Sequence, residues 1–334
     1  MKLPTIEDVA SAAGVSKATV SRVLGGAFTH IRPDTRQRVE EAIQALNYRP
    51  SAVARSLTSH RTYTVGMLVS DVANPFYGEV IHGVEDEAIA AGYNVLLANT
   101  NYDLDRGMAL VRSLIDRRAD GVLVMSSSAS EAWLEELSRA AVPAVALDWS
   151  GPEIDRVSRI EVDFGPGIAE AAAHLLSLGH NRLGHIAGPL HLRTSRDRRD
   201  AFLDAAEAGG VPREKVLIAT GELTIDGGRE AWRQLREQLR TPTAIFCAND
   251  LMALGALSAA RAEGLRVPGD LSIIGLDDIW LAAQFDPPLT TVALPRYEIG
   301  GLAMRMLFEL LSGFPAERRV VTTSLVVRKS TGAR

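Results

Sequence analysis

The stretch "TIEDVASAAGVSKATVSRVLGG", residues 5–26, holds two helical patterns that are separated by one glycine. Thr5 and Asp8 have the spacing of a capping box, and small or aliphatic residues then recur at helical intervals, at Ile6, Val9, Ala10 and Ala13. Gly14 ends this first helix. Ser16 is the expected N-cap of a second helix over about 17–24, whose inward face holds Val20, Val23 and Leu24.

A third helix follows within "RPDTRQRVEEAIQALNY", residues 32–48, where Val39, Ile43 and Leu46 mark the buried stripe. Three short helices with a tight glycine-containing turn between the first two make up a helix-turn-helix. In that motif the second helix enters the major groove of DNA. We therefore predict an all-α helix-turn-helix head over residues 1–49 that binds double-stranded DNA.

The outward face of the second helix carries the candidate DNA contacts. Arg22 can donate two hydrogen bonds to O6 and N7 of one guanine, and such a pair discriminates between bases by ~1–3 kcal/mol. Lys17 and Ala18 share this face. Hydroxyl groups suit phosphate oxygens, which fix the register without reading the base sequence, and they belong to Ser16, Thr19 and Ser21. The alternative is an ordinary surface helix in a small capped bundle.

Charge is unevenly distributed along the 334 residues. Residues 1–60 have a net charge of +3, whereas the rest of the chain has a net charge of −8. This asymmetry suggests a nucleic-acid-binding module attached to a different body, although a solvated charged face also produces such an excess.

The composition predicts a cytoplasmic protein. No segment has 18 apolar residues without a charge, and Glu7 and Asp8 stand where a signal peptide needs apolar residues. We therefore expect neither a membrane span nor export. The one cysteine, Cys247, lies in an apolar run, so disulfides and cysteine-based zinc sites are not expected.

From residue 63 onward, apolar strand patterns alternate with amphipathic helical patterns. The first series has strands within 63–70, 93–100, 120–126 and 142–149. A second series begins with "RIEVD" and continues with strands within 182–188, 215–220, 243–250 and 271–278. A helix at about 297–312 and one strand, "VVTTSLVVR", complete the body. This pattern predicts an α/β body of two doubly wound parallel-sheet subdomains with a cleft between them.

The same pattern gives the domain boundaries. Residues 50–61 are expected to form a hinge helix or linker, and residues 62–334 an effector-binding and dimerisation core. Within the core, one subdomain is placed at about 62–160 plus 291–320 and the other at about 161–290 plus 321–334.

The motifs of several enzyme classes are missing from the sequence. The first strand is followed by "SDVANPFY", with no G-x-G-x-x-G, and no G-x-x-x-x-G-K-[ST] occurs, so no nucleotide cofactor is expected. The histidines lack the spacing of a metal site, and there is no G-x-S-x-G elbow. We predict that the protein is not an enzyme and uses no cofactor or metal.

Taken together, these features resemble the lactose-repressor family of transcription regulators, most closely its ribose- and purine-repressor-type members. Residues 5–26 and "NYRPSAVARSL" are similar to the head and hinge of that family. The motifs "NPFYGEVIHGVE", "RRADGVLVM", "TAIFCANDLMALGAL", "LSIIGLDD" and "DPPLTTV" are similar to its sugar-binding core. The likeness covers residues 5–327 and implies subdomains of the periplasmic-binding-protein type I kind.

The resemblance also implies how the hinge acts. In such regulators the hinge becomes a helix on DNA, which would place Arg55 among the DNA contacts and Leu57 in the minor groove. An apolar side chain inserted between base pairs kinks the duplex and allows more protein surface to be wrapped. The alternative for Leu57 is a simple hydrophobic residue in a linker.

An effector pocket in the cleft is a further implication. Its candidate residues all follow the carboxyl ends of strands, where open α/β sheets bind ligands, and they are Phe76, Tyr77, Trp149, Arg198, Asn249, Asp250 and Asp277. Aromatic faces combined with acid, amide and guanidinium groups suit a polyhydroxylated ring. Each residue also has an ordinary explanation: Phe76 in the core, Arg198 in a surface ion pair, Asp250 as a helix N-cap.

Two positions depart from relatives of this kind. Leu294 stands where sugar-responsive members often have a pocket glutamine, and Leu192 stands where the purine repressor has a base-contacting arginine. These departures weigh against a purine and favour a smaller or less hydroxylated sugar, or a derivative with an apolar edge.

We therefore expect a homodimeric repressor that binds a pseudo-palindromic operator and is controlled by a monosaccharide or a derivative. Dimerisation follows because one helix-turn-helix reads only a half-site. Two alternatives share parts of this pattern: a sugar-binding transport protein, which lacks the helix-turn-helix, and an α/β enzyme.

Overall fold

The structure is a computed structural model of the chain. It describes residues 4–25, 29, 31–49, 61–126, 129–149, 151–238 and 241–334. The chain divides into two compact units, Met1–Tyr63 and Thr64–Arg334, and each is described by itself.

The first unit contains three helices, α1 (Ile6–Ala13), α2 (Lys17–Leu24) and α3 (Pro33–Ala45). The predicted capping box is confirmed, because the Thr5 hydroxyl accepts from the Asp8 amide and the Asp8 carboxylate accepts from the Thr5 amide. Gly14 ends α1 with φ 64°, a left-handed conformation that glycine adopts without steric cost. The three helices enclose a small core that includes Val9, Val20 and Val39, each fully buried.

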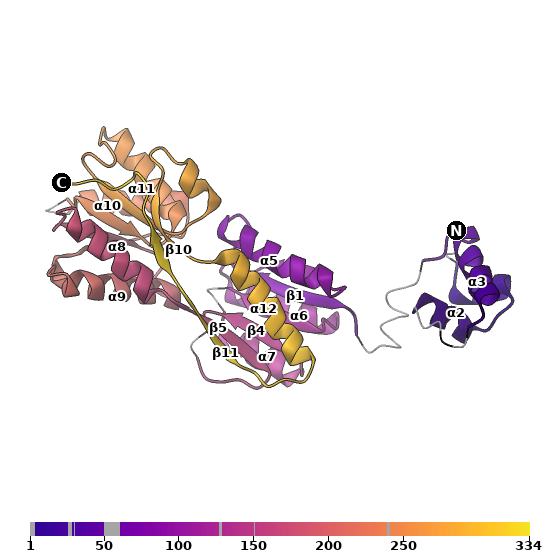
Figure 1. Ribbon diagram of the computed structural model, residues 1–334. Helices are drawn as coiled ribbons and strands as arrows, with labels where there is room; N and C mark the ends of the chain where they lie inside the picture. The colour runs from indigo at the N-terminus through magenta and orange to yellow at the C-terminus, as the bar shows by residue number, and fades with distance from the viewer. Residues whose placement is uncertain are drawn as a thin grey trace. The chain divides into compact units, whose positions relative to one another are not determined.

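In the second unit, the first sheet is entirely parallel and has the strand order β11-β5-β4-β3-β1-β2. Its strands are β1 (Thr64–Val69), β2 (Asn94–Asn99), β3 (Gly121–Met125), β4 (Ala144–Leu147), β5 (Val157–Asp163) and β11 (Arg318–Thr322). Helices α5 (Phe76–Ala90) and α12 (Arg296–Leu311) pack together on one face. Helices α6 (Leu104–Asp116) and α7 (Glu131–Arg139) pack together on the other (Figure 1).

The second sheet repeats this arrangement with the order β12-β10-β9-β8-β6-β7. Its strands are β6 (Leu183–Ala187), β7 (Leu217–Thr220), β8 (Ala244–Cys247), β9 (Ser272–Asp277), β10 (Thr290–Ala293) and β12 (Ser324–Val326). The paired helices α8 (Gly165–Ser177) and α9 (Arg193–Ala208) lie on one side, and α10 (Ile225–Arg236) and α11 (Asp250–Ala262) on the other. Short 3₁₀ helices, η1 (Arg213–Lys215) and η2 (Trp280–Gln284), complete it.

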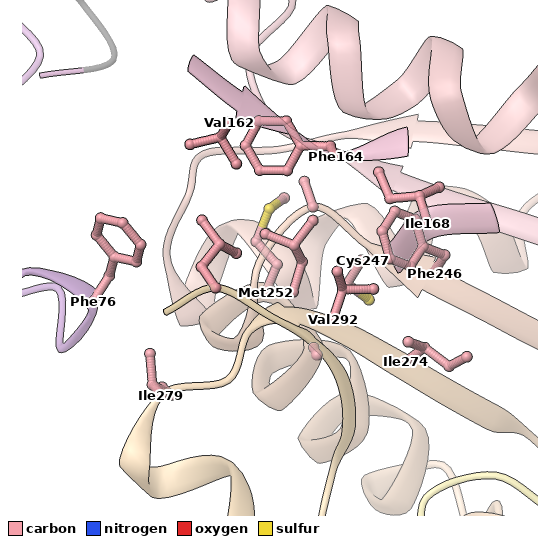
Figure 2. Close-up of a cluster of buried hydrophobic side chains, with 14 of the residues drawn as sticks. Phe76, Val162, Phe164, Ile168, Phe246, Cys247, Met252, Ile274, Ile279 and Val292 are labelled. Atoms are coloured by element: carbon pink, nitrogen blue, oxygen red, sulfur yellow. The ribbon is translucent and has the colours of Figure 1, made fainter. Parts of the chain in front are cut away.

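Burial on both faces explains the apolar strands. Strands β3, β6, β8 and β9 are buried at every position, as expected for parallel strands covered by helices on both sides. Figure 2 shows this core around the second sheet, where Ile168 of α8 lies near Phe246 of β8 and Val292 of β10. Two doubly wound α/β subdomains, as the sequence predicts, therefore make up the core.

The chain crosses between the subdomains at places that differ from the strand-by-strand prediction. "RIEVD" belongs to β5, which pairs with β4 and β11 and so completes the first sheet instead of starting the second. "VVTTSLVVR" is not one strand, because β11 joins the first sheet whereas β12 runs antiparallel to β10 in the second. The chain also stays in the second sheet through Ala293, slightly past the expected boundary at 291.

Within the described part of the chain, no helix has the length and apolar character needed to span a bilayer.

Candidate functional site

The outward face of α2 carries the predicted DNA contacts. Lys17, Ala18, Ser21 and Arg22 are exposed, and Thr19 is half-buried. The Ser16 hydroxyl accepts from the Thr19 amide at 3.2 Å, so it caps α2 as predicted. Arg22 forms no ion pair or side-chain hydrogen bond with the residues that the structure describes.

Lys17 differs from Arg22, because it forms an ion pair with Glu7 of α1. Both side chains are mostly exposed, so the pair contributes little stability and can be broken by a phosphate or base. Arg55 and Leu57, the hinge residues predicted to contact DNA, lie outside the described residues.

In the core, a cavity of about 60 Å³ lies at the carboxyl ends of the parallel strands of the two sheets. The first subdomain contributes the lining residues Asn74, Phe76, Tyr77, Tyr102, Met125, Ser126, Leu147, Asp148 and Val162. The segments of the second subdomain contribute Phe164, Thr194, Arg198, Leu223, Asn249, Asp277 and, at the crossover, Leu294. Since both sheets end here, residues far apart in the sequence converge on one site. We call this cavity the cleft pocket.

Aromatic rings form one wall of the cleft pocket. Phe76 and Tyr77 begin α5 and pack edge to face, with ring centroids 5.1 Å apart and an angle of 88° between the rings. Burial raises the pKa of Tyr77 to about 12, although hydrogen bonds with Ser70 oppose the rise. Burial also raises the pKa of Tyr102, so both hydroxyls stay neutral and can donate as well as accept.

Asp277 and Arg198 are two charged residues that line this pocket and interact electrostatically. Asp277, the last residue of β9, is buried, and burial raises the pKa of its carboxyl to about 6, against the opposing effect of Arg198 and Arg296. Its carboxylate accepts no hydrogen bond from the described residues. The Arg198 guanidinium lies 4.6 Å from the Phe164 ring centroid and donates to the Ala248 carbonyl at 2.8 Å. Its Nε is buried without a partner among those residues.

Asp148 is a second acid of the cleft pocket that the sequence analysis did not single out. It follows β4 directly, and burial raises the pKa of its carboxyl while Arg193 and Arg198 oppose the rise. Its place directly before Trp149, which the sequence analysis did select, was the available signal.

Asn249 and Asp250 have different roles from each other. Asn249 lines the cleft pocket but also caps α11, accepting from the Met252 amide at 2.8 Å. Asp250 is fully buried and does not line the pocket. Its carboxylate accepts from the Thr291 hydroxyl at 2.6 Å and from the Ile279 amide at 2.8 Å, which joins α11 to β10 and to the segment after β9.

Trp149 lies outside the cleft pocket. Its indole N–H donates to the Pro152 carbonyl at 3.2 Å. Trp149 lines a different cavity, whose other lining residues lie within 152–159 and 316–318. The structure thus brings Phe76, Tyr77, Arg198, Asn249 and Asp277 together, but neither Trp149 nor Asp250. Leu294 and Leu192 are the two positions that differ from sugar- and purine-responsive relatives. Leu294 lines the pocket, whereas Leu192 is buried at the start of α9.

Each of the two compact units matches a known protein family. Residues 5–51 match the family model of bacterial regulatory proteins of the lacI family, and residues 172–331 match that of periplasmic binding protein-like domains. The HTH-type transcriptional repressor PurR of Photobacterium profundum is 40% identical over 331 residues, covering 98% of each chain. Catabolite control protein A of Priestia megaterium is 37% identical over 318 residues, covering 95% of each.

Solved structures give the same result. A lac repressor dimer bound to operator and the anti-inducer ONPF has a TM-score of 0.87 and 29% identity, covering 99% of this chain and 100% of that one. A complex of the transcriptional regulator CelR with cellobiose has a TM-score of 0.73 and 33% identity, covering 98% and 99%. With a head and a core that both match over nearly their whole length, the chain belongs to the lacI family of bacterial regulatory proteins.

Proposed function

We propose that this protein is a DNA-binding transcriptional repressor whose affinity for its operator is controlled by a small molecule bound in the cleft pocket. The exposed Arg22 on a capped recognition helix supports DNA binding, and the similarity to PurR and to the operator-bound lac repressor supports repression. A homodimer on a pseudo-palindromic operator follows, because one such helix reads only a half-site. This mechanism requires no catalysis.

The effector that fits the cleft pocket best is a monosaccharide or a derivative. The single observation that carries this proposal is that Asp277 and Arg198 line one pocket together with the Phe76 and Tyr77 rings. A carboxylate accepts from ligand hydroxyls and a guanidinium donates to them, while an aromatic face covers the C–H side of a sugar ring. Leu147, Leu223 and Leu294 give the pocket apolar sides, which favours a ligand with an apolar edge.

The pocket test is a thermal-shift screen with a panel of pentoses, hexoses, their phosphates and purine bases, followed by calorimetry on any hit. Asp277→Ala should weaken binding of the hit at least several-fold, because it leaves ligand hydroxyls unpaired in a buried site. Asp226→Ala, which removes an exposed acid of α10, is the control and should bind normally. A purine hit would overturn the sugar assignment, and unchanged affinity in Asp277→Ala would overturn the pocket.

DNA binding needs a separate test. Wild-type protein should select a two-fold symmetric sequence from a random DNA library, and the selected duplex should be released or retained when the effector is added. Failure to enrich any sequence would favour a ligand-binding protein without a regulatory role.

A further inference from the structure

Two arginines reach across the cleft from opposite subdomains, and the arrangement of one mirrors that of the other. Arg193 is the first residue of α9 in the second subdomain, and one of its Nη atoms donates to the carbonyl oxygen of Asp148 in the first. Arg296 is the first residue of α12 in the first subdomain, and one of its Nη atoms donates to the carbonyl oxygen of Asp277 in the second. Each arginine therefore holds the backbone of a cleft-pocket acid that belongs to the other subdomain.

The second Nη atom of each arginine is fixed within its own subdomain. Arg193 pairs with Asp197, one turn along α9, at 2.5 Å. Arg296 pairs with Glu79 of α5 at 2.9 Å. A guanidinium suits this double task because it presents several donors in a rigid plane, so one group can bind two acceptors at a fixed angle.

The two acids also match each other. Asp148 directly follows β4 and Asp277 ends β9, and these strands occupy corresponding places in the two sheet orders. Both residues have positive φ, 57° and 120°, which is uncommon for a residue other than glycine. Such conformations persist where surrounding contacts enforce them, and the arginine at each carbonyl is one such contact.

Neither arginine lines the cleft pocket, so neither is placed to touch a ligand there. Residues of both subdomains line the pocket, so its width depends on how far apart the two subdomains lie. Movement of the subdomains apart would widen the pocket, and the contacts that cross the cleft oppose that movement.

From these contacts we propose that Arg193 and Arg296 are paired positioning residues, which link the two subdomains across the cleft and fix the two pocket acids for ligand binding. The proposal rests on the proposed function only in treating the cleft pocket as the effector site. Charge-assisted hydrogen bonds to buried carbonyls are among the stronger contacts in proteins. The two bridges consequently resist opening of the cleft and keep Asp148 and Asp277 in the uncommon backbone conformation.

The test measures the full-length protein without DNA or ligand. In Arg193→Met, amide hydrogen exchange should become at least about fivefold faster in residues 144–149, across the cleft from the substitution, and in Arg296→Met in residues 272–278. Arg199→Met and Arg305→Met are matched controls, because these arginines of α9 and α12 pair with Asp200 and Glu87 inside one subdomain. The lysine variants of Arg193 and Arg296 should restore part of the protection.

A distance measurement tests closure directly. Spin labels at Val72→Cys and Glu222→Cys, two exposed positions on opposite subdomains, should report a longer and broader distance in the double variant Arg193→Met/Arg296→Met than in wild type. Cys247 is fully buried and stays unlabelled. Dilution with unlabelled protein removes distances between two copies.

A second pair of variants weakens the same bridges without removing an arginine: Asp197→Asn and Glu79→Gln. These variants replace the arginine variants in both measurements if an arginine variant does not fold. Unchanged exchange and distance in these and the methionine variants would overturn the proposal. Because neither measurement uses an effector or DNA, this outcome is distinct from failure of the proposed regulatory function.

Discussion

Gly83 of α5 and Gly300 of α12 lie where these two helices of the first subdomain meet backbone to backbone. A Cβ atom built on Gly83 would lie 2.0 Å from the Tyr297 carbonyl oxygen, and one on Gly300 would lie 2.0 Å from that of Val80. These distances leave no room for even a methyl group, so the close packing of α5 on α12 depends on both glycines.

Gly83→Ala should destabilise the core by ~1–3 kcal/mol or more, because the added methyl group forces the two backbones apart. Gly78→Ala is the matched control in the same helix: it is exposed, with nothing within 4 Å of a built Cβ. Since alanine favours helix more than glycine, this control should be neutral or more stable by about 0.5–1 kcal/mol. Urea unfolding of the three proteins measures the difference, and equal stability of both variants would contradict the packing account.

Asp277 should make the stability of the core depend on pH in one direction. Burial raises its pKa from 3.8 to about 6, so the folded protein holds this proton more tightly than the unfolded chain does. Its contribution to the free energy of unfolding therefore falls as pH rises from about 4 to about 6 and is level above that range. The pKa difference corresponds to about 3 kcal/mol, at 1.36 kcal/mol for each pKa unit.

The charges around Asp277 come from Arg198 of α9 and Arg296 of α12, with Asp250 of α11 also nearby. Asp277→Asn removes the titration and keeps the shape, so its stability relative to wild type should increase by about 2 kcal/mol between pH 4.5 and pH 7. Asp226→Asn, at an exposed acid, should show no such trend. A stability difference between Asp277→Asn and wild type that stays constant with pH would show that Asp277 ionises normally.

Arg22→Ala should weaken binding to the selected operator by ~1–3 kcal/mol and relax the preference at one base pair in each half-site. Binding to random DNA should change little, because a base contact adds nothing there. Arg36→Ala, in α3 and outside the recognition helix, is the control. Fluorescence anisotropy on both duplexes gives the two affinities, and an equal loss on each would assign Arg22 to a phosphate instead.

A fragment of residues 62–334 should fold and should bind no operator. Its urea concentration at the midpoint of unfolding should equal that of the core in the full chain. The reason is that Thr64–Arg334 forms a compact unit with both sheets and its own core. Circular dichroism, light scattering and the operator-binding assay check the three expectations. Insolubility of the fragment would show that the head or the hinge is needed for the core to fold.

Much of this fold could be predicted from the sequence because the signals are local. The capping box of Thr5 and Asp8, the left-handed turn at Gly14 and the cap at Ser16 each depend on residues a few positions apart, and all three are present in the structure. The alternation of apolar strands and amphipathic helices is likewise local, and it correctly predicts two doubly wound sheets.

Only the tertiary structure decided which sheet each strand joins and which side chains meet in the cleft. The alternating apolar and polar pattern of β5 suits either sheet. Its pairing with β11 brings together segments about 160 residues apart, and its pairing with β4 completes its place in the first sheet. The bridges from Arg193 to Asp148 and from Arg296 to Asp277 have no sequence spacing to reveal them, because they exist only once the two subdomains face each other. The sequence by itself determined the helix-turn-helix and the two α/β units through local periodicity and capping. The strand crossovers and the cross-cleft contacts depend on long-range packing, which no local pattern encodes.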